Sequence, residues 1–338
     1  MDDENVLKWG ICGAGKISSD FCNGMSTLSR FEREHKIVAI AARSKESAEK
    51  FANKFGFIDK AYGSYDEIAK DPTIEVVYIG VIHTEHVRLS MMMLEAGKHV
   101  VCEKPLAATW EECKKVLDFA REKKLLFIEA VWSRFFPVYE AIKDEVESGK
   151  LGVVNMVTAQ FCVPTISVER VQRKNLMGGC LLDIGIYCVQ FVTHIYGELP
   201  EKIIATGSLT EEGIDEDGCV IMLFSGNRKA NVTYSGKTPE THNCATVMGT
   251  EGKIHLEDCF WSPKEVQLSS GTVENKLPAA SSGDYYFSNS AGLRYEAAHA
   301  HDMIKKRGQI DSPLYGYKDV EMVHKIMDEI QNQIGLKY

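Results

Sequence analysis

The chain has 338 residues, which is long for one hydrophobic core and favours two domains. Its formal net charge of -9, with no basic stripe to offset it, argues against a nucleic-acid surface. The acidic start Met-Asp-Asp-Glu-Asn, and the lack of an uninterrupted run of about 18 apolar residues, argue against a secretory signal and a membrane span, so we expect a cytoplasmic protein. Ten cysteines without a C-x-x-C pair are expected to be buried, reduced thiols.

A glycine-rich turn follows the first apolar run. Residues 7–12 form a short buried strand by pattern, and Gly13-Ala-Gly15-Lys16-Ile17-Ser18 leads into an amphipathic helix. Gly13 permits the tight bend, Gly15 lets the backbone approach a pyrophosphate, and the small Ser18 allows close packing of helix on strand. The turn alone is a weak signal, but a strand before it and a helix after it indicate a dinucleotide site.

The second strand ends at a basic residue. Residues 36–42 are rich in Ile, Val and Ala and are followed by Arg43 and Ser44, which begins a helix to residue 55. An acidic residue at this strand end suits the ribose hydroxyls of NAD, whereas an arginine suits the 2′-phosphate of NADP. Arg43 therefore favours NADP, although a plain surface arginine is the alternative.

Two further strands end at candidate site residues. The apolar run 74–82 ends at His83-Thr-Glu-His86, and residues 98–102 end at Glu103-Lys104-Pro105. A His-x-x-His pair without a third ligand makes a metal site improbable. Ligands of open α/β sheets lie outside the carboxyl ends of the strands, so we expect these residues beside the cofactor.

The alternation of strands and helices predicts a doubly wound parallel Rossmann domain over residues 1–130. Residues 131–338 are predicted to form an α+β domain with a large, mostly antiparallel, open sheet. Its strands are expected at residues 153–163, 201–209, 217–225, 228–236, 242–249 and 252–257. Helices at 295–306 and 317–334 close the chain and could pack back on the first domain.

A second-domain helix carries a carboxylate in apolar surroundings. Residues 179–196 are apolar nearly all round, which predicts a buried helix, yet they include Asp183. A carboxylate is rarely buried without a partner, because its desolvation costs several kcal/mol. Asp183 and Tyr187 lie four residues apart and share one helix face.

The glycine-rich turn, the Glu103-Lys104-Pro105 tripeptide and the Asp183-x-x-x-Tyr187 helix together resemble the Gfo/Idh/MocA oxidoreductase family. The similarity runs through nearly the whole chain, including Glu129-Ala-Val-Trp-Ser-Arg-Phe-Phe-Pro137 and Leu181-Leu-Asp-Ile-Gly-Ile-Tyr-Cys-Val-Gln-Phe191. It is strongest to the branch that oxidises dihydrodiols and D-xylose. In much of the broader family a histidine occupies the position of Tyr187.

This resemblance implies a set of site residues. The catalytic residues would be Tyr187 as acid/base, with Lys104 and Asp183 beside it. The NADP-binding residues would be Gly13, Gly15, Lys16, Ile17, Arg43, Ser44, His83, His86, Glu103, Lys104, Trp132 and Arg134. The substrate-binding residues would be Trp132, Phe161, Asp183, Tyr187 and, by a looser match, Phe287.

The proposed base is chemically reasonable. A tyrosine with an ordinary pKa near 10 needs a drop of roughly three units, or about 4 kcal/mol, to act as a base near neutral pH. One ammonium at about 4 Å in an effective dielectric of about 20 supplies about that energy. Tyr187 could then take the proton of a carbinol whose hydride leaves for the nicotinamide. Asp183 could bind a second substrate hydroxyl or orient Lys104.

Each residue also has a structural alternative. Tyr187 could be a core tyrosine and Lys104 an ordinary loop lysine, Arg134 could pair with Glu129, and Trp132 could pack in a hinge between the domains.

The resulting hypothesis is an NADP-dependent dehydrogenase that oxidises a cyclic diol or an aldose, such as a trans-dihydrodiol of benzene or D-xylose. The alternatives are another sugar or polyol dehydrogenase, a dicarbonyl reductase, or a dinucleotide-sensing regulator without turnover. Because residues 219–224 are apolar at nearly every position, both faces of that strand need cover, and a homodimer is expected.

Overall fold

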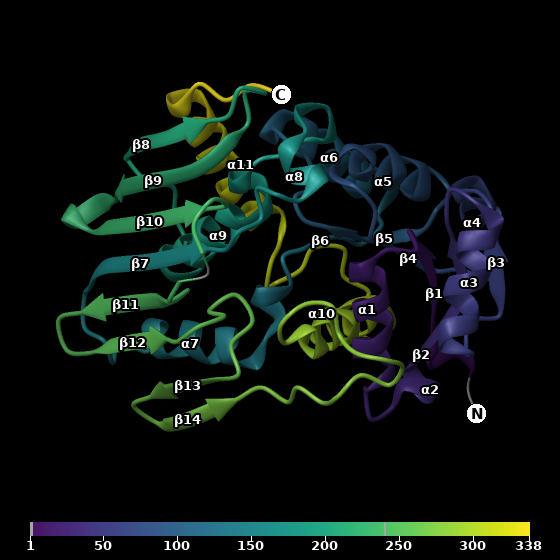
Figure 1. Cartoon of the computed structure of the whole chain (residues 1–338). Helices are drawn as coiled ribbons and strands as arrows, with labels where there is room; N and C mark the ends of the chain where they lie inside the picture. The colour runs from purple at the N-terminus through teal and green to yellow at the C-terminus, as the bar shows by residue number, and fades with distance from the viewer. Residues whose placement is uncertain (1–2, 240) are drawn as a thin grey trace. The chain divides into compact units, whose positions relative to one another are not determined.

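The computed structural model describes residues 3–239 and 241–338, and the chain divides into two compact units (Figure 1). The first unit comprises Met1–Ala107, Glu112–Phe135 and Lys276–Tyr317, and the second comprises Ala108–Glu111, Phe136–Asn275 and Lys318–Tyr338. The sequence predicted a division after residue 130, with closing helices that could pack back on the first domain; in the structure residues 276–317 belong to the first unit and residues 318–338 to the second. That return depends on tertiary packing, which no local pattern encodes.

The first unit contains the predicted parallel sheet of six strands, in the order β3-β2-β1-β4-β5-β6. The strands are β1 Leu7–Cys12, β2 His35–Ala41, β3 Lys60–Tyr62, β4 Val76–Ile79, β5 His99–Glu103 and β6 Phe127–Ala130. Its helices are α1 Lys16–Ser26, α2 Phe31–Glu34, α3 Lys45–Phe55, α4 Tyr65–Lys70, α5 His86–Glu95, most of α6 Trp110–Lys123, and α10 Leu293–His301, which continues as a π-helical turn at Asp302–Arg307. The 3₁₀ turns are η1 Asp3–Asn5, η2 His83–Glu85, η3 Trp132–Phe135 and η7 Ser290–Gly292.

Apolar side chains on both sides of this sheet form the core of the first unit. All four residues of β4 are buried, as expected for a strand covered on both faces. The rings of Phe21 on α1 and Tyr78 on β4 stack with their centroids 3.8 Å apart. Helix α10 packs against α1, so the returning segment completes this layer.

The second unit contains a mixed sheet in the order β12-β11-β7-β10-β9-β8. The strands are β7 Val154–Cys162, β8 Lys202–Leu209, β9 Asp215–Leu223, β10 Lys229–Ser235, β11 Ala245–Gly249 and β12 Lys253–Leu256, with a separate hairpin of β13 Glu265–Leu268 and β14 Gly271–Glu274. Its helices are α7 Pro137–Glu147, α8 Glu169–Gln172, α9 Ile186–Tyr196 and α11 Tyr317–Ile334, with 3₁₀ turns at Lys174–Leu176 and Ser225–Asn227. All sheet pairings are antiparallel except β7 with β10, and the hairpin was not predicted.

The two faces of this sheet differ in burial. Helix α9 packs against β7 and β10 and covers the face that carries Val157 and Val232. On the opposite face Ile204 and Ile221 pair across β8 and β9, and these side chains are 46% and 45% exposed. Cys219 on the same face is also exposed, Cys244 and Cys259 are partly exposed, and the other seven cysteines are buried as expected.

One helical stretch of the described residues, Lys174–Tyr196, is long and apolar enough to pass a composition test for a membrane span, with a mean hydropathy of 1.6. Its apolar window is 89% buried in the structure, and the core helix of a soluble protein passes the same test.

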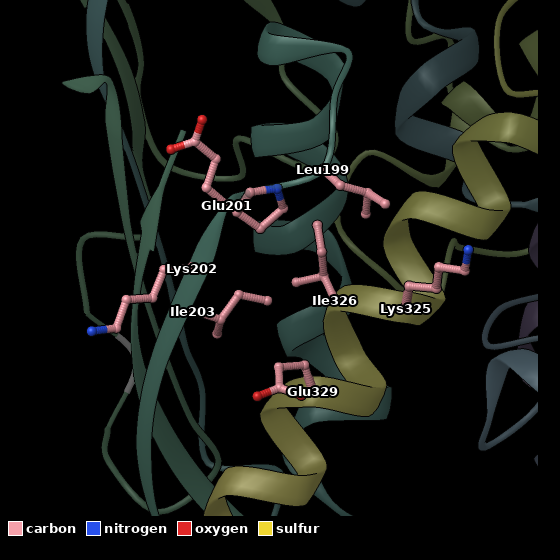
Figure 2. A pocket seen from close by; sticks show the side chains of 8 residues that line it. Leu199, Glu201, Lys202, Ile203, Lys325, Ile326 and Glu329 are labelled. Atoms are coloured by element: carbon pink, nitrogen blue, oxygen red, sulfur yellow. The ribbon is translucent and has the colours of Figure 1, made fainter. Parts of the chain in front are cut away.

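A surface pocket in the second unit lies between the start of β8 and helix α11 (Figure 2). Leu199, Ile203 and Ile326 form its apolar floor, while Lys202 and Lys325 extend away from it in Figure 2. None of the predicted site residues lines this pocket, so it is separate from the candidate site.

Candidate active site

The candidate site of the first unit lies at the carboxyl edge of the parallel sheet. Strands β1, β2, β4, β5 and β6 run parallel, so the segments that follow them emerge at one edge. Every predicted NADP-binding residue follows one of these strands or, in the case of Glu103, ends it. The structure therefore brings all of these segments to one edge of the sheet: Gly13–Ile17, Arg43–Ser44, His83–His86, Glu103–Lys104 and Trp132–Arg134.

In the glycine-rich turn, packing requires a glycine at position 13 but leaves space for a side chain at position 15. Gly13 has a φ of +102°, and a Cβ atom there would overlap the carbonyl oxygen of Gly80. A Cβ atom on Gly15 would be 3.7 Å from the same oxygen, an ordinary contact, so the protein itself does not require that glycine. The Ser18 hydroxyl donates to the carbonyl of Gly80 over 3.3 Å, which fixes α1 against the sheet.

The segment after β2 places a cation at the same edge. Arg43 is exposed directly before Ser44, whose hydroxyl accepts a hydrogen bond from the backbone N–H of Ser47 over 3.2 Å and caps α3. Burial raises the pKa of Tyr65, and the Arg43 guanidinium opposes this rise. An anion bound here would meet the Arg43 charge and the amino end of α3 together.

The two histidines after β4 differ in their environment. Their ring centroids are 5.7 Å apart, but His86 is fully buried. Its Nδ1 lies 2.7 Å from the carbonyl oxygen of Pro105 and its Nε2 lies 3.2 Å from that of Val81, while burial lowers the pKa of this imidazole. His86 therefore joins the turn after β4 to the turn that carries Lys104. Among residues 3–239 and 241–338, no group of three or more His, Cys, Asp and Glu side chains could hold a metal ion.

Buried carboxyl groups surround the end of β5. The hydroxyl of Tyr78 donates to Glu103 Oε1 over 2.5 Å, and burial raises the pKa of Glu103 to about 7, against the opposing effects of Tyr78 and Lys104. Glu296 on α10 is fully buried, and burial together with the nearby Glu103 raises its pKa well above the ordinary value. Glu103, one member of this buried carboxyl pair, directly precedes Lys104 in the chain.

The segment after β6 is held by an aromatic contact. Trp132 and Arg134 are both 5% exposed, and the Arg134 guanidinium lies 5.0 Å from the ring centroid of Tyr315. The hydroxyl of Tyr315 donates to Glu129 Oε2 over 3.2 Å. Tyr315 thus contacts both Arg134 and Glu129, the residue that the sequence suggested as an ion-pair partner of Arg134.

Phe287 lies in a segment that is attached to α1. The carboxylate of Asp20 accepts hydrogen bonds from the backbone N–H of Tyr286 over 2.9 Å and of Phe287 over 3.0 Å, and Asn23 Oδ1 accepts one from Ser282 over 2.9 Å. Phe287 is 46% exposed. Of the predicted substrate residues, Phe287 and Trp132 therefore belong to the first unit.

In the second unit, Asp183 and Tyr187 lie on the predicted buried helix and are 5% and 7% exposed. The helix begins with a π-helical turn at Leu181–Gly185 and continues as α9. Such wide turns are frequent at functional sites. The Asp183 carboxylate is paired with Arg170, whose Nη1 donates to Oδ1 over 2.9 Å.

A second carboxylate caps the same helix. Asp215 Oδ2 accepts a hydrogen bond from the backbone N–H of Leu181 over 2.6 Å. Burial raises the pKa of Asp215 to about 7, although the backbone N–H groups at the helix start oppose the rise. Gly179 has a φ of +108°, and a Cβ atom there would overlap the Asp215 carboxylate, so the glycine leaves room for the cap.

Aromatic rings surround Tyr187. Phe161 on β7 stacks on Trp261 with the ring centroids 3.7 Å apart, and their centroids lie 5.8 Å and 6.5 Å from that of Tyr187. Phe161 was predicted from the sequence, whereas Trp261 and Arg170 were not, because both lie outside any periodic segment. The second unit contains Asp183, Tyr187 and Phe161, and the first unit contains Lys104.

Two domain families match consecutive parts of the chain. The first, described as the oxidoreductase family with an NAD-binding Rossmann fold, matches residues 7–130, and the second, the GFO/IDH/MocA C-terminal domain, matches residues 139–255. The trans-1,2-dihydrobenzene-1,2-diol dehydrogenase of Xenopus tropicalis is 43% identical over 334 residues, which cover 98% of this chain and 99% of the relative. The protein of that name from Homo sapiens is 40% identical and covers 98% of each chain.

Solved structures share the fold over nearly the whole length. Levoglucosan dehydrogenase in complex with NADH and levoglucosan has a TM-score of 0.83 at 22% identity and covers 98% of this chain and 97% of its own. A 3-ketoreductase from Actinomadura kijaniata in complex with NADP has a TM-score of 0.79 at 19% identity and covers 98% of each chain. Full-length relatives at about 40% identity, together with both family matches, show that the chain belongs to the Gfo/Idh/MocA family of oxidoreductases.

Proposed function

We propose that this protein is an NADP-dependent dehydrogenase that oxidises a hydroxyl-bearing carbon of a cyclic diol or an aldose, such as a trans-dihydrodiol of benzene or D-xylose. The observation that carries the proposal is full-length similarity at about 40% identity to relatives named trans-1,2-dihydrobenzene-1,2-diol dehydrogenase. The buried acidic helix with Asp183 and Tyr187 is consistent with that activity.

The residues of the first unit fit a phosphorylated dinucleotide. Gly13 is required for the turn, Gly15 leaves its surroundings open, and no side chain caps the amino end of α1 in the part of the chain that the structure describes. Backbone N–H groups at that helix end would hold the pyrophosphate, and Arg43 would hold the 2′-phosphate. When bound, NADP supplies the ring that accepts the hydride.

The remaining chemistry falls to the residues of this chain. Before the reaction, Lys104 would stabilise Tyr187 as a phenolate, and this phenolate would accept the proton of the substrate hydroxyl and become a phenol as the hydride leaves the same carbon. An ammonium placed at about 4 Å would be worth about 4 kcal/mol at an effective dielectric of about 20, which is the stabilisation that a tyrosine base requires. Phe161, Trp132 and Phe287 would form apolar walls against a ring-shaped substrate, and the stacked Trp261 extends that set.

A homodimer is part of this proposal. The outer face of the second sheet exposes Ile204 of β8, Ile221 of β9 and Met156 of β7, together with the charged side chains of Lys202 and Lys229. Burial of the exposed apolar side chains against another surface would be favourable. A second copy of the same sheet presents a matching surface, as an isologous interface requires.

The test is a substrate screen with purified protein. We expect reduced cofactor to accumulate when NADP is mixed with a trans-dihydrodiol of benzene or with D-xylose, and to accumulate more slowly with NAD. Turnover of another polyol alone, or of dicarbonyls in the reverse direction, would replace the substrate assignment. Tight NADP binding without turnover of any of these compounds would instead indicate a dinucleotide-sensing regulator.

A further inference from the structure

Asp183 is held by an arginine that no sequence motif indicates. Its carboxylate is almost fully buried, and Arg170 reaches it from the short helix α8, Glu169–Gln172. Nη1 of Arg170 donates to Oδ1 of Asp183 over 2.9 Å, while 39% of the arginine side chain remains exposed. A hydrogen bond between two charged groups is about twice as strong as one between neutral groups.

The backbone around Arg170 is fixed independently of this ion pair. The backbone N–H of Gly179 donates to the carbonyl of Val171 over 2.9 Å, and that of Gly178 donates to the carbonyl of Arg173 over 3.0 Å. A Cβ atom on Gly178 would overlap the Val171 carbonyl, and the Val171 side chain is fully buried. Helix α8 is therefore fixed against the start of the helix that carries Asp183. This backbone positions the Arg170 guanidinium beside the Asp183 carboxylate before any substrate binds.

This pairing determines the chemical form of Asp183. A buried carboxylate without a cation shifts its pKa upward and takes a proton, but a guanidinium stays charged and favours the ionised form. An ionised carboxylate only accepts hydrogen bonds and has about four lone-pair sites, of which this contact uses one. Asp183 is thereby prepared to accept a hydrogen bond from a hydroxyl group.

We propose that Arg170 is a positioning residue that holds Asp183 as an ionised acceptor for the second hydroxyl of the substrate, so that the enzyme selects compounds with two adjacent hydroxyls. This inference rests on the proposed function and assigns Asp183 to substrate selection rather than to the orientation of Lys104. Arg170 also balances the negative charge of Asp183. The proposed base Tyr187, which lies one helical turn after Asp183, therefore has an ion pair of zero net charge beside it rather than a lone carboxylate.

The experiment compares trans-1,2-cyclohexanediol with cyclohexanol, two rings that differ by one hydroxyl. Arg170→Gln is expected to lower kcat/KM for the diol by about 10- to 100-fold, mainly through KM, and for the mono-alcohol by less than about 3-fold. Arg170→Lys should recover part of the loss, because it restores the charge without the planar geometry. Arg173→Gln is the matched control, since Arg173 lies on the same segment and pairs with the exposed Glu212 over 3.5 Å; its kinetics should match those of the unchanged protein.

A double substitution shows whether Arg170 acts through Asp183. In the Asp183→Asn background, Arg170→Gln should cause no further loss of diol turnover. Equal losses for diol and mono-alcohol, or a further loss in the Asp183→Asn background, would overturn the inference and leave the proposed dehydrogenase activity in place. Absence of turnover by the unchanged protein with either cofactor and either class of alcohol would overturn both.

Discussion

The pH dependence of stability should report the buried cap of the helix that carries Tyr187. Asp215→Asn replaces a fully buried carboxyl by a neutral group of nearly the same shape that keeps an oxygen acceptor for the backbone N–H of Leu181. Burial raises the pKa of Asp215 from 3.8 to about 7 in the folded protein. The unfolded chain therefore releases this proton near pH 4, whereas the folded chain retains it until about pH 7.

The sign and size of the effect follow from proton linkage. Between pH 4 and 7 the folded state binds one more proton than the unfolded state, so this group lowers the free energy of unfolding as pH rises. The pKa of Asp215 shifts by about three units, and each unit corresponds to about 1.4 kcal/mol. The group therefore lowers the free energy of unfolding by at most about 4 kcal/mol, and the full loss is reached above about pH 7. Burial raises the pKa of neighbouring Cys180, Tyr234 and Tyr338 above their ordinary values, so these groups titrate outside this window.

The assay is urea-induced unfolding of the unchanged protein and of Asp215→Asn at several values between about pH 4.5 and about pH 8.5, which cover most of the window between the two pKa values. Over this range the variant should gain about 3 kcal/mol of stability relative to the unchanged protein. Asp217→Asn is the matched control on the same strand: Lys237 and Ser208 hold the pKa of Asp217 below its ordinary value, so that substitution should cost stability at neutral pH. A stability difference between Asp215→Asn and the unchanged protein that stays constant with pH would refute the reasoning.

Four further predictions concern the proposed activity and assembly. Tyr187→Phe should lower kcat by at least about 100-fold and leave NADP affinity nearly unchanged, as fluorescence titration can measure; undiminished turnover would reject Tyr187 as the base. Arg43→Ala should weaken NADP by about 10-fold or more but NAD by much less, and an equal loss for both would remove the 2′-phosphate assignment. Gly13→Ala should abolish dinucleotide binding and cost about 2 kcal/mol or more in the free energy of unfolding, because its Cβ overlaps the Gly80 carbonyl at a positive φ. Ile221→Asp should shift a dimer towards monomer in sedimentation, whereas a concentration-independent monomer before substitution would contradict the interface.

The fold was predicted in most of its parts because the local patterns are strong. The glycine-rich turn, the strands of the parallel sheet and the buried helix each carry a local sequence pattern. The strand that begins at Lys229 was expected within one residue of its observed start. The pairing of β7 with β10 was not predicted as parallel, since pairing direction depends on how distant strands meet. The hairpin of β13 and β14 was missed because its alternating residues are few and polar.

The site was predicted less completely than the fold. Residues in motifs, such as Gly13 and Asp183, could be identified from type and spacing. Arg170 could not, because a surface arginine on a four-residue helix has no sequence feature that names its buried partner. Trp261 follows the last strand of the sheet in an irregular loop, so its stacking on Phe161 becomes visible only in three dimensions.

The π-helical turn at Leu181–Gly185 makes chain length matter at one place. Its hydrogen bonds span one residue more than those of an ordinary helical turn. Removing Ile184 would let the turn tighten to ordinary helical hydrogen bonds, so the helix beyond it would keep its place and the phenol of Tyr187 would stay where it is. Asp183, inside the turn, would instead change its spacing to Tyr187 from four residues to three, so this deletion should disturb the carboxylate while the phenol is spared.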